Sequence, residues 1–373
     1  MEPVTAILMV GGWGASDLEQ ALRQAHRAAV HDLLERLLAT GAVGRAVLAT
    51  DDPALAASLG GLPVTVDLDG SSEPFHFGRR LAGLIEAYGA RRVLYSGGGS
   101  APLMSTDEWR AVLTQLSDAA RMVISNNLHS CDWVGFTQAD EVLPLVAGQA
   151  SDNALAWVLH HEGGLPAESR APTAATRFDL DTPVDLLVAQ KHPGVGSHLA
   201  QLLAEWNWDG ARLDALLKVM ATDGASLMVA GRASSIAWQA LERATSCWVR
   251  VFAEERGMRA SGRQEKGQVR SLLADYLGLI GPDGFFEALP ALADGVLLDN
   301  RVILAARRLW PTAPDRYNSD LLRWEQVSEP FLREFTRAAA TAAVPVVMGG
   351  HSVVAGGLLA LVEILQARRS SRK

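Results

Sequence analysis

The first half of the chain alternates short, continuous apolar runs with longer segments in which apolar residues recur at helical spacing. The apolar runs predict strands at residues 5–10, 45–50, 62–66, 92–96 and 122–125. The helical spacing predicts helices at residues 18–40, 77–88 and 106–117. Continuous apolar strands separated by helices are typical of a sheet that is buried on both faces. We therefore expect an α/β fold with a Rossmann-like, mostly parallel sheet.

The pattern changes after Gly194, where helical periodicity dominates as far as about residue 279. Closer to the C-terminus, residues 344–361 predict a buried strand, a Gly349-Gly350-His351-Ser352 turn and a helix. We expect two domains: an α/β domain at residues 1–193, and a mainly α-helical domain of unknown function at residues 194–373.

The composition is that of an ordinary globular protein, with 373 residues, 49% of them hydrophobic and 20% charged. It excludes a disordered chain and a disulfide-stapled miniprotein. The formal charge of -8 provides no global basic field for nucleic acid or anionic lipid, so we expect neither as a partner.

Three features favour a cytoplasmic protein. Cys131 and Cys247 lie far apart without metal-type spacing, as free thiols in a reducing compartment do. The N-terminus lacks the charged and apolar regions of a signal peptide. The apolar residues 338–361 are interrupted by Pro345, glycines and His351, which argues against a membrane span.

Three motifs occur in a characteristic order. GGWG at residues 11–14 follows the first strand, SGGGSAPLMS at residues 96–105 follows a middle strand, and FDLDTPVDL stands at residues 178–186. Over residues 1–190 this order resembles the GT-A type nucleotidyltransferases, in particular the molybdenum-cofactor and 2-phospho-lactate guanylyltransferases. The resemblance implies that the fold is of the GT-A nucleotidyltransferase type.

The resemblance also implies a phosphate-binding loop. The family's opening motif is L-A-G-G-x-G-x-R-M, whose glycines wrap the nucleotide phosphates, and Gly11, Gly12 and Gly14 match them. The family's arginine is absent, because residues 15–17 read Ala-Ser-Asp. In the middle motif, G-D-x-P-L, the family's aspartate holds Mg²⁺, and Ser100 stands in its place. A hydroxyl is a poor replacement for a carboxylate as a ligand of a hard cation.

The closing motif is the best preserved, and the resemblance makes Asp179 and Asp181 the catalytic residues and the Mg²⁺ ligands. Two residues apart on an extended segment, they point to the same face. A structural role for Asp181 is equally open, because it precedes Pro183 at the expected start of a helix and could cap that helix.

The second half contains an unusual basic stretch. Its five cations follow one another at intervals of three and four: Arg256, Arg259, Arg263, Lys266 and Arg270. On a helix they share one face, and like charges so arranged favour an anionic ligand. Three glycines at residues 257, 262 and 267 would instead allow a loop around an anion. A third interpretation is a solvated face whose cations pair with Glu254, Glu255 and Glu265.

Two polar clusters and one histidine complete the candidates. Residues 299–301 (Asp-Asn-Arg) and the turn-like residues 315–320 are dense in hydrogen-bonding groups, so each is either exposed or organised around something. His351 could act as an acid, a base or a phosphate donor, or be a satisfied core residue.

The sequence therefore predicts a nucleotidyltransferase-like protein that binds a nucleotide or a phosphorylated small molecule. In its active form it would transfer a nucleotidyl group to a phosphorylated acceptor with Mg²⁺. The residues predicted to bind phosphate are Gly11, Gly12, Gly14, Ser100, Arg259, Arg263, Arg270 and His351.

Two alternatives stay open, and with them the question of whether the chain is an enzyme. One is a catalytically degenerate binding or assembly protein, with a homodimer interface rich in tryptophan at residues 206, 208, 238 and 248. The other is an enzyme whose site lies in the C-terminal half.

Overall fold

The computed structural model of the chain describes residues 3–70 and 74–370. The chain forms two compact units, and most close backbone contacts lie within one unit or the other. The first comprises Met1–Trp13, Gln24–Thr176 and Gly196–Leu199, and the second comprises Gly14–Arg23, Arg177–Val195 and Ala200–Lys373. The FDLDTPVDL segment therefore groups with the second unit.

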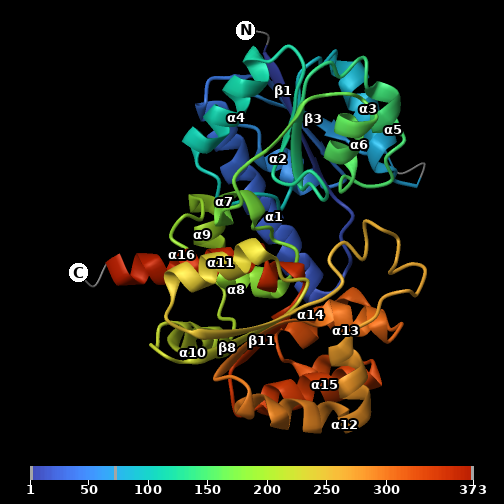
Figure 1. Cartoon of the computed structure of the whole chain (residues 1–373). Coiled ribbons are helices and arrows are strands. Elements are labelled where there is room, and N and C mark those ends of the chain that lie inside the picture. Colours follow the sequence, from blue (N-terminus) through green and yellow to red (C-terminus); the bar gives the residue numbers. More distant parts are fainter. Residues whose placement is uncertain (1–2, 71–73, 371–373) are drawn as a thin grey trace. The chain divides into compact units, whose positions relative to one another are not determined.

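The first unit is built on a seven-stranded sheet in the order β3-β2-β1-β4-β6-β5-β7 (Figure 1). Its strands are β1 (Val4–Val10), β2 (Val43–Thr50), β3 (Val64–Leu68), β4 (Val93–Gly97), β5 (Val123–Ser125), β6 (Trp133–Phe136) and β7 (Ala167–Ser169). All neighbours pair in parallel except β6, which is antiparallel to β4 and β5. The predicted α/β fold with a mostly parallel sheet is confirmed, although the sequence pattern missed β6 and β7.

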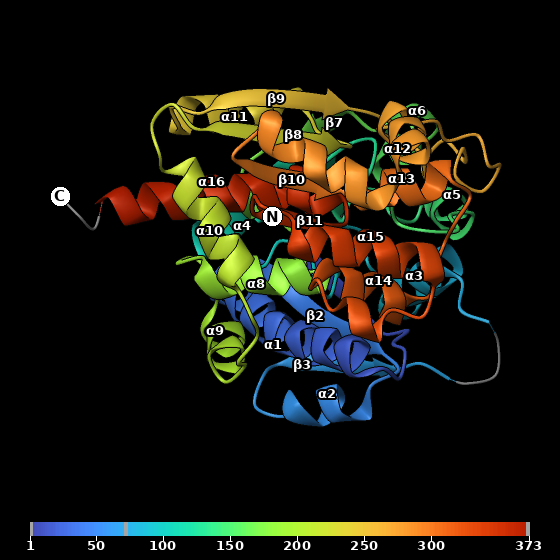
Figure 2. The same ribbon diagram turned by 90° about the horizontal axis from the view of Figure 1, so that it is seen from below.

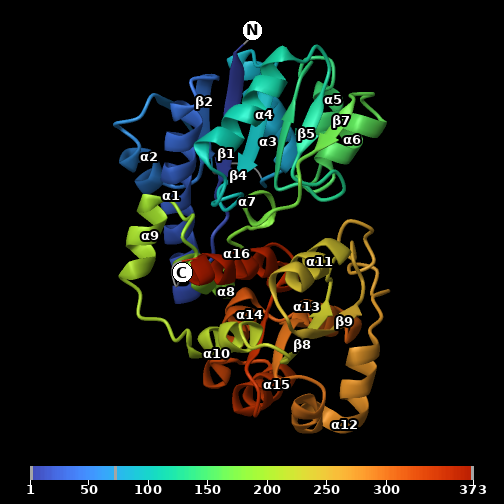
Figure 3. The same cartoon turned by 60° about the vertical axis from the view of Figure 1, so that its left-hand side comes forward.

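Helices cover both faces of this sheet, as the unbroken apolar strands predict. The helices are α1 (Asp17–Ala39), α2 (Pro53–Ser58), α3 (Phe77–Tyr88), α4 (Thr106–Asp118), α5 (Leu143–Ala147), α6 (Leu155–His161) and α7 (Ala174–Arg177). Ile7 of β1 packs in a core with α3, α5 and α6, whereas its neighbours Ala6 and Leu8 pack in a second core with α1, α2 and α4. Figure 3 shows β1 and β4 side by side in the middle of the sheet.

The second unit contains a sheet of its own in addition to its helices. Four parallel strands lie in the order β11-β10-β8-β9. They are β8 (Ser226–Gly231), β9 (Trp248–Ala253), β10 (Gly295–Asp299) and β11 (Val346–Gly349). Of these strands, only β11 was expected from the sequence.

The remaining helices follow α7 in the chain, and all but the start of α9 belong to the second unit. They are α8 (Pro183–Lys191), α9 (Ser197–Ala204), α10 (Ala211–Met220), α11 (Ser235–Ala244), α12 (Leu272–Ala288), α13 (Asn300–Ala306), α14 (Ala313–Asp320), α15 (Pro330–Thr341) and α16 (Gly356–Ser370). In Figure 2, α12 and α15 lie beside β8, β10 and β11. Phe286 of α12 and Phe335 of α15 pack with the apolar side chains of these strands in one core.

The apolar C-terminal stretch divides as predicted into β11, a short turn from His351 to Val354, and α16. In the described part of the chain, no helix is both long enough and apolar enough to cross a membrane.

Candidate functional site

A pocket of about 940 Å³ lies at the carboxyl ends of β1 and β4 in the first unit. Both glycine motifs line it, with Gly11 and Gly12 after β1, and Gly97 and Gly98 at the end of β4. Here the strand order of the sheet changes direction, since β1 connects outward to β2 on one side while β4 lies on the other. Ligands of open α/β sheets bind outside the strand ends at such a switch point.

An acidic side chain closes the first glycine loop. The Gly12 amide donates to Asp51 Oδ2 at 3.0 Å. A Cβ at Gly11 would lie 2.7 Å from Asp51 Oδ1, so a larger residue there would displace the Asp51 side chain. Gly12 has φ of +76°, which favours glycine. The predicted loop therefore forms, but one amide that the resemblance assigns to phosphate is held by the chain's own carboxylate.

A second acid occupies the following turn. The Glu19 carboxylate accepts from the Ser16 amide at 3.1 Å and from its hydroxyl at 2.6 Å. A Cβ on Gly14 would lie 2.0 Å from Glu19 Oε1, so this glycine is needed to admit the carboxylate. Gly14 belongs to the second unit and does not line the pocket.

Ser100, the residue in the family's aspartate position, has a structural hydrogen bond. Its hydroxyl donates to the Asp132 carbonyl at 3.0 Å, and the side chain is 9% exposed. Ser100 does not line the pocket.

Several charged groups at the pocket already have partners. Arg80 donates to Asp67 at 2.7 Å and to Asp69 at 2.6 Å, and the Tyr95 hydroxyl donates to Asp152 at 3.0 Å.

Two residues that line the pocket have exposed side chains, and neither was among the site residues predicted from the sequence. Phe75 is 69% exposed. Arg79 is an exposed residue in the first turn of α3, with no carboxylate within 4 Å in the described part of the chain. The local signal was the FHFGRR sequence at residues 75–80, which places aromatic and basic residues at a predicted helix start.

Asp179 and Asp181 lie in the second unit, on the segment leading into α8. The structure corrects the capping interpretation of Asp181, because Thr182 is the N-cap residue. The Asp185 carboxylate accepts from the Thr182 amide and hydroxyl, both at 2.8 Å. Burial, and then the charge of Asp181, raise the pKa of Asp185 to about 7.

The basic stretch forms a loop rather than the helix that its spacing suggested. Residues 254–271 join β9 to α12 through successive turns, and the glycines at residues 257, 262 and 267 have φ between +62° and +73°. Arg263 pairs with Glu255 at 2.8 Å, and the Arg270 guanidinium donates to the Val269 carbonyl at 2.9 Å. These two arginines therefore stabilise the loop, whereas Arg259 lies over the Trp310 ring, 5.4 Å from its centroid.

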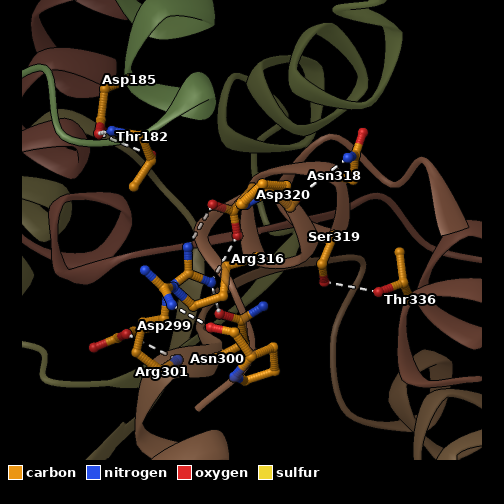
Figure 4. Close-up of polar contacts among 12 residues, drawn as sticks. Thr182, Asp185, Asp299, Asn300, Arg301, Arg316, Asn318, Ser319, Asp320 and Thr336 are labelled. Carbon is orange, nitrogen blue, oxygen red and sulfur yellow. Dashed lines mark hydrogen bonds and ion pairs between the residues drawn. The ribbon is translucent and has the colours of Figure 1, made fainter. Parts of the chain in front are cut away.

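The carboxyl ends of the second sheet gather several charged groups. Arg232, directly after β8, forms a two-point ion pair with Asp299, the last residue of β10, at 2.5 and 3.1 Å. Arg301 pairs with Asp320 at 2.6 and 2.8 Å, and both are at most 5% exposed. Figure 4 shows Arg301, Asp320 and Arg316 close together.

This cluster of charged residues at the carboxyl ends of the second sheet includes members of both predicted polar segments, residues 299–301 and 315–320. Residues 315–320 were expected to be turn-like, but they belong to α14, which is capped by Thr312. Its Asp315 accepts from the amides of Ser328 and Glu329 at 2.7 and 3.0 Å, so that carboxylate secures the start of α15.

His351 stands two residues after β11 and is exposed, so the core interpretation is wrong.

In the residues that the structure describes, one group has the geometry of a metal site: Asp32, Glu35 and His198. Both oxygens of Asp32 are already hydrogen-bonded, to the amides of His198 and Leu199 at 3.0 Å each. These amides begin α9, so Asp32 caps that helix. Asp179 and Asp181 belong to no such group.

No model of a known protein family matches the chain, and no curated protein does. Solved structures similar over about half of it are nucleotidyltransferases and related transferases. A protein described as a nucleotide-diphospho-sugar transferase from Desulfovibrio desulfuricans G20 is 15% identical, with a TM-score of 0.41, over 56% of this chain and 100% of its own. A cytidylyltransferase from Leptospira borgpetersenii is 15% identical, with a TM-score of 0.39, over 55% and 93%. The manganese complex of Rv0371C from Mycobacterium tuberculosis is 15% identical, with a TM-score of 0.36, over 55% and 100%.

Proposed function

We propose that this chain is a nucleotidyltransferase-like protein that binds a nucleotide in the pocket of its first unit. One observation carries the proposal: the pocket lies at the switch point of the seven-stranded sheet and is lined by both glycine motifs. Its volume of about 940 Å³ is in the range of pockets that hold compact organic ligands.

The exposed side chains of Phe75 and Arg79 suit the base and the phosphates of a nucleotide, respectively. The exposed ring of Phe75 offers an apolar face on which a base stacks. The Arg79 guanidinium offers a charge and several donors to a phosphate. A nucleotide held by these groups would not require the Gly12 amide.

The proposal also includes a bound Mg²⁺ and transfer of the nucleotidyl group to a phosphorylated acceptor. Mg²⁺ in nucleotide sites is held by one or two carboxylates together with the substrate phosphates. At the glycine loop Asp51 fits one such ligand, since its Oδ2 accepts from Gly12 and its Oδ1 has no hydrogen bond in the described part of the chain. A bound Mg²⁺ would supply charge neutralisation on the phosphates. Asp179 and Asp181, the ligands expected from the sequence, belong to the second unit.

A second candidate function is nucleotide binding without transfer. It is favoured by Ser100, whose hydroxyl donates to the main chain where the family has a metal-binding aspartate. Dependence of binding on Mg²⁺ separates the two functions.

The test is isothermal titration of the full chain with GTP, CTP, ATP and UTP, each with and without Mg²⁺. We expect saturable binding of at least one nucleotide that Arg79→Ala and Phe75→Ala each weaken about tenfold, the loss of one charged hydrogen bond or one stacked ring. Arg91→Ala is the matched control, because this exposed arginine precedes β4 at the end opposite the pocket.

Binding that requires Mg²⁺, and that Asp51→Asn abolishes, supports the transferase. Equal binding without Mg²⁺ supports the non-catalytic protein. No binding of any nucleotide, or binding that Arg79→Ala leaves unchanged, contradicts the proposed site.

A further inference from the structure

The second sheet has its own switch point, independent of the nucleotide site in the first unit. In chain order its strands are β8, β9, β10 and β11, yet in space β8 lies between β9 and β10. The chain therefore runs outward from β8 to β9 on one side and from β10 to β11 on the other. Outside the carboxyl ends of β8 and β10, this topology forms the kind of site where open α/β sheets bind ligands.

The backbone brings the carboxyl ends of β8 and β10 into close contact. Gly231, the last residue of β8, has φ of +117°, and a Cβ there would lie 2.4 Å from Cβ of Asp299. A larger residue would separate the strand ends. The close approach places Arg232 against Asp299, where Nε donates at 2.5 Å.

A buried cation stands next to this pair. Arg301 is 5% exposed, and its two-point ion pair with Asp320 uses both terminal nitrogens. Its Nη1 also donates to Asn300 Oδ1 at 2.6 Å. The Asn300 side chain is 1% exposed, and its Nδ2 has no hydrogen-bond partner among the described residues. An unpaired buried donor is costly, so a ligand oxygen here would satisfy it.

Two further guanidiniums have no carboxylate partner. Arg259 and Arg316 both lie over the Trp310 ring, 5.4 and 5.0 Å from its centroid. In the described residues neither has a carboxylate oxygen within 4 Å, whereas Arg232 and Arg301 do.

The positive charges of these arginines lower one another's pKa values. The surrounding protein, and then Arg232, lower the pKa of Arg259. Burial, and then Arg301, lower the pKa of Arg316. Asp181 and Glu265 partly offset the effect on Arg259. Arg232 and Arg301 are thus neutralised in close ion pairs, whereas in the described residues Arg259 and Arg316 have only more distant carboxylates.

We propose that the carboxyl ends of β8 and β10 bind the phosphate group of a phosphorylated small molecule between Arg259 and Arg316. A phosphate monoester carries a charge of about −1.5 to −2 at pH 7, so it suits two guanidiniums without ion-pair partners better than a singly charged carboxylate does, although Arg316 also donates to the Pro311 carbonyl. Guanidinium forks also match the oxygens of a phosphate geometrically.

The test is titration of the full chain with inorganic phosphate, with sodium chloride at equal ionic strength as the baseline and acetate as the carboxylate probe. We expect phosphate to bind at least tenfold more tightly than acetate. The variant Arg259→Ala/Arg316→Ala should bind phosphate at least tenfold more weakly. Arg307→Ala is the matched control, because this arginine also lies over an aromatic ring, Phe331, but outside the cluster.

Thermal unfolding without phosphate separates binding from folding. Removing Arg259 and Arg316 relieves repulsion but also removes two contacts with the Trp310 ring, so we expect the double variant to melt within a few degrees of the wild type. A fall of several degrees would show that these arginines serve the fold, and would overturn the proposal.

Two other results would overturn it as well. One is equal binding of phosphate and acetate. The other is phosphate binding that survives in the double variant but is lost in Arg79→Ala, which would place the phosphate in the first unit. Loss of nucleotide binding in Arg79→Ala with intact phosphate binding would leave this second site standing by itself.

Discussion

The buried ion pair between Arg301 and Asp320 permits a quantitative prediction about the second unit. Asp320→Asn keeps the shape of the side chain but removes its charge. Arg301, 5% exposed, would then retain the Asn300 carbonyl and one neutral amide as acceptors, with no counter-charge inside hydrogen-bond distance. Removing one partner of a buried pair costs about 3–5 kcal/mol, because the other charge stays desolvated.

The assay is native-state hydrogen exchange on peptides that cover β10 and β11, in phosphate-free buffer. These strands are buried in the core of the second unit, so their slowest amides report its unfolding without interference from the first unit. Since each 1.4 kcal/mol is a factor of ten, exchange should accelerate by about a hundredfold to several thousandfold.

A paired replacement isolates the cause. Arg301→Met/Asp320→Leu removes both charges, and we expect its stability to lie within about 1 kcal/mol of the wild type or above it. An acceleration below tenfold in Asp320→Asn, or a double variant as unstable as the single one, would refute the argument that an unpaired buried charge sets the cost.

Two further predictions concern the same unit. Asp185 has a pKa of about 7 in the fold against an ordinary 3.8, so the folded state binds a proton that the unfolded chain has lost between these values. Stability should therefore fall as pH rises from about 4 to 7, by up to about 1.4 kcal/mol per pH unit, and Asp185→Asn should flatten this slope in urea unfolding while the exposed Asp283→Asn does not. Gly231→Ala should lower the free energy of unfolding by about 1–3 kcal/mol more than Gly224→Ala does. Both glycines have positive φ, but only Gly231 lies against Asp299. Equal losses in the two variants would show that the ends of β8 and β10 can separate freely.

Much of the local structure was determined by the sequence alone. The unbroken apolar run of β1 required a sheet covered on both faces, because such a strand has no polar side to turn to water. Helix α3 occupies the predicted residues 77–88, since its apolar spacing and its C-terminal Gly89, with φ of +59°, are local signals. The strand, turn and helix of the last apolar stretch were readable for the same reason.

The chemistry of the site was decided only by the tertiary structure. Asp51 reaches Gly12 across 39 positions of sequence, and Arg232 reaches Asp299 across 67. Which charges meet depends on strand order, and spacing within a few residues carries no information about it. For this reason the spacing of the basic stretch indicated five equivalent cations, whereas the fold engages Arg263 and Arg270 within their loop and brings Arg259 to Trp310 and Arg316.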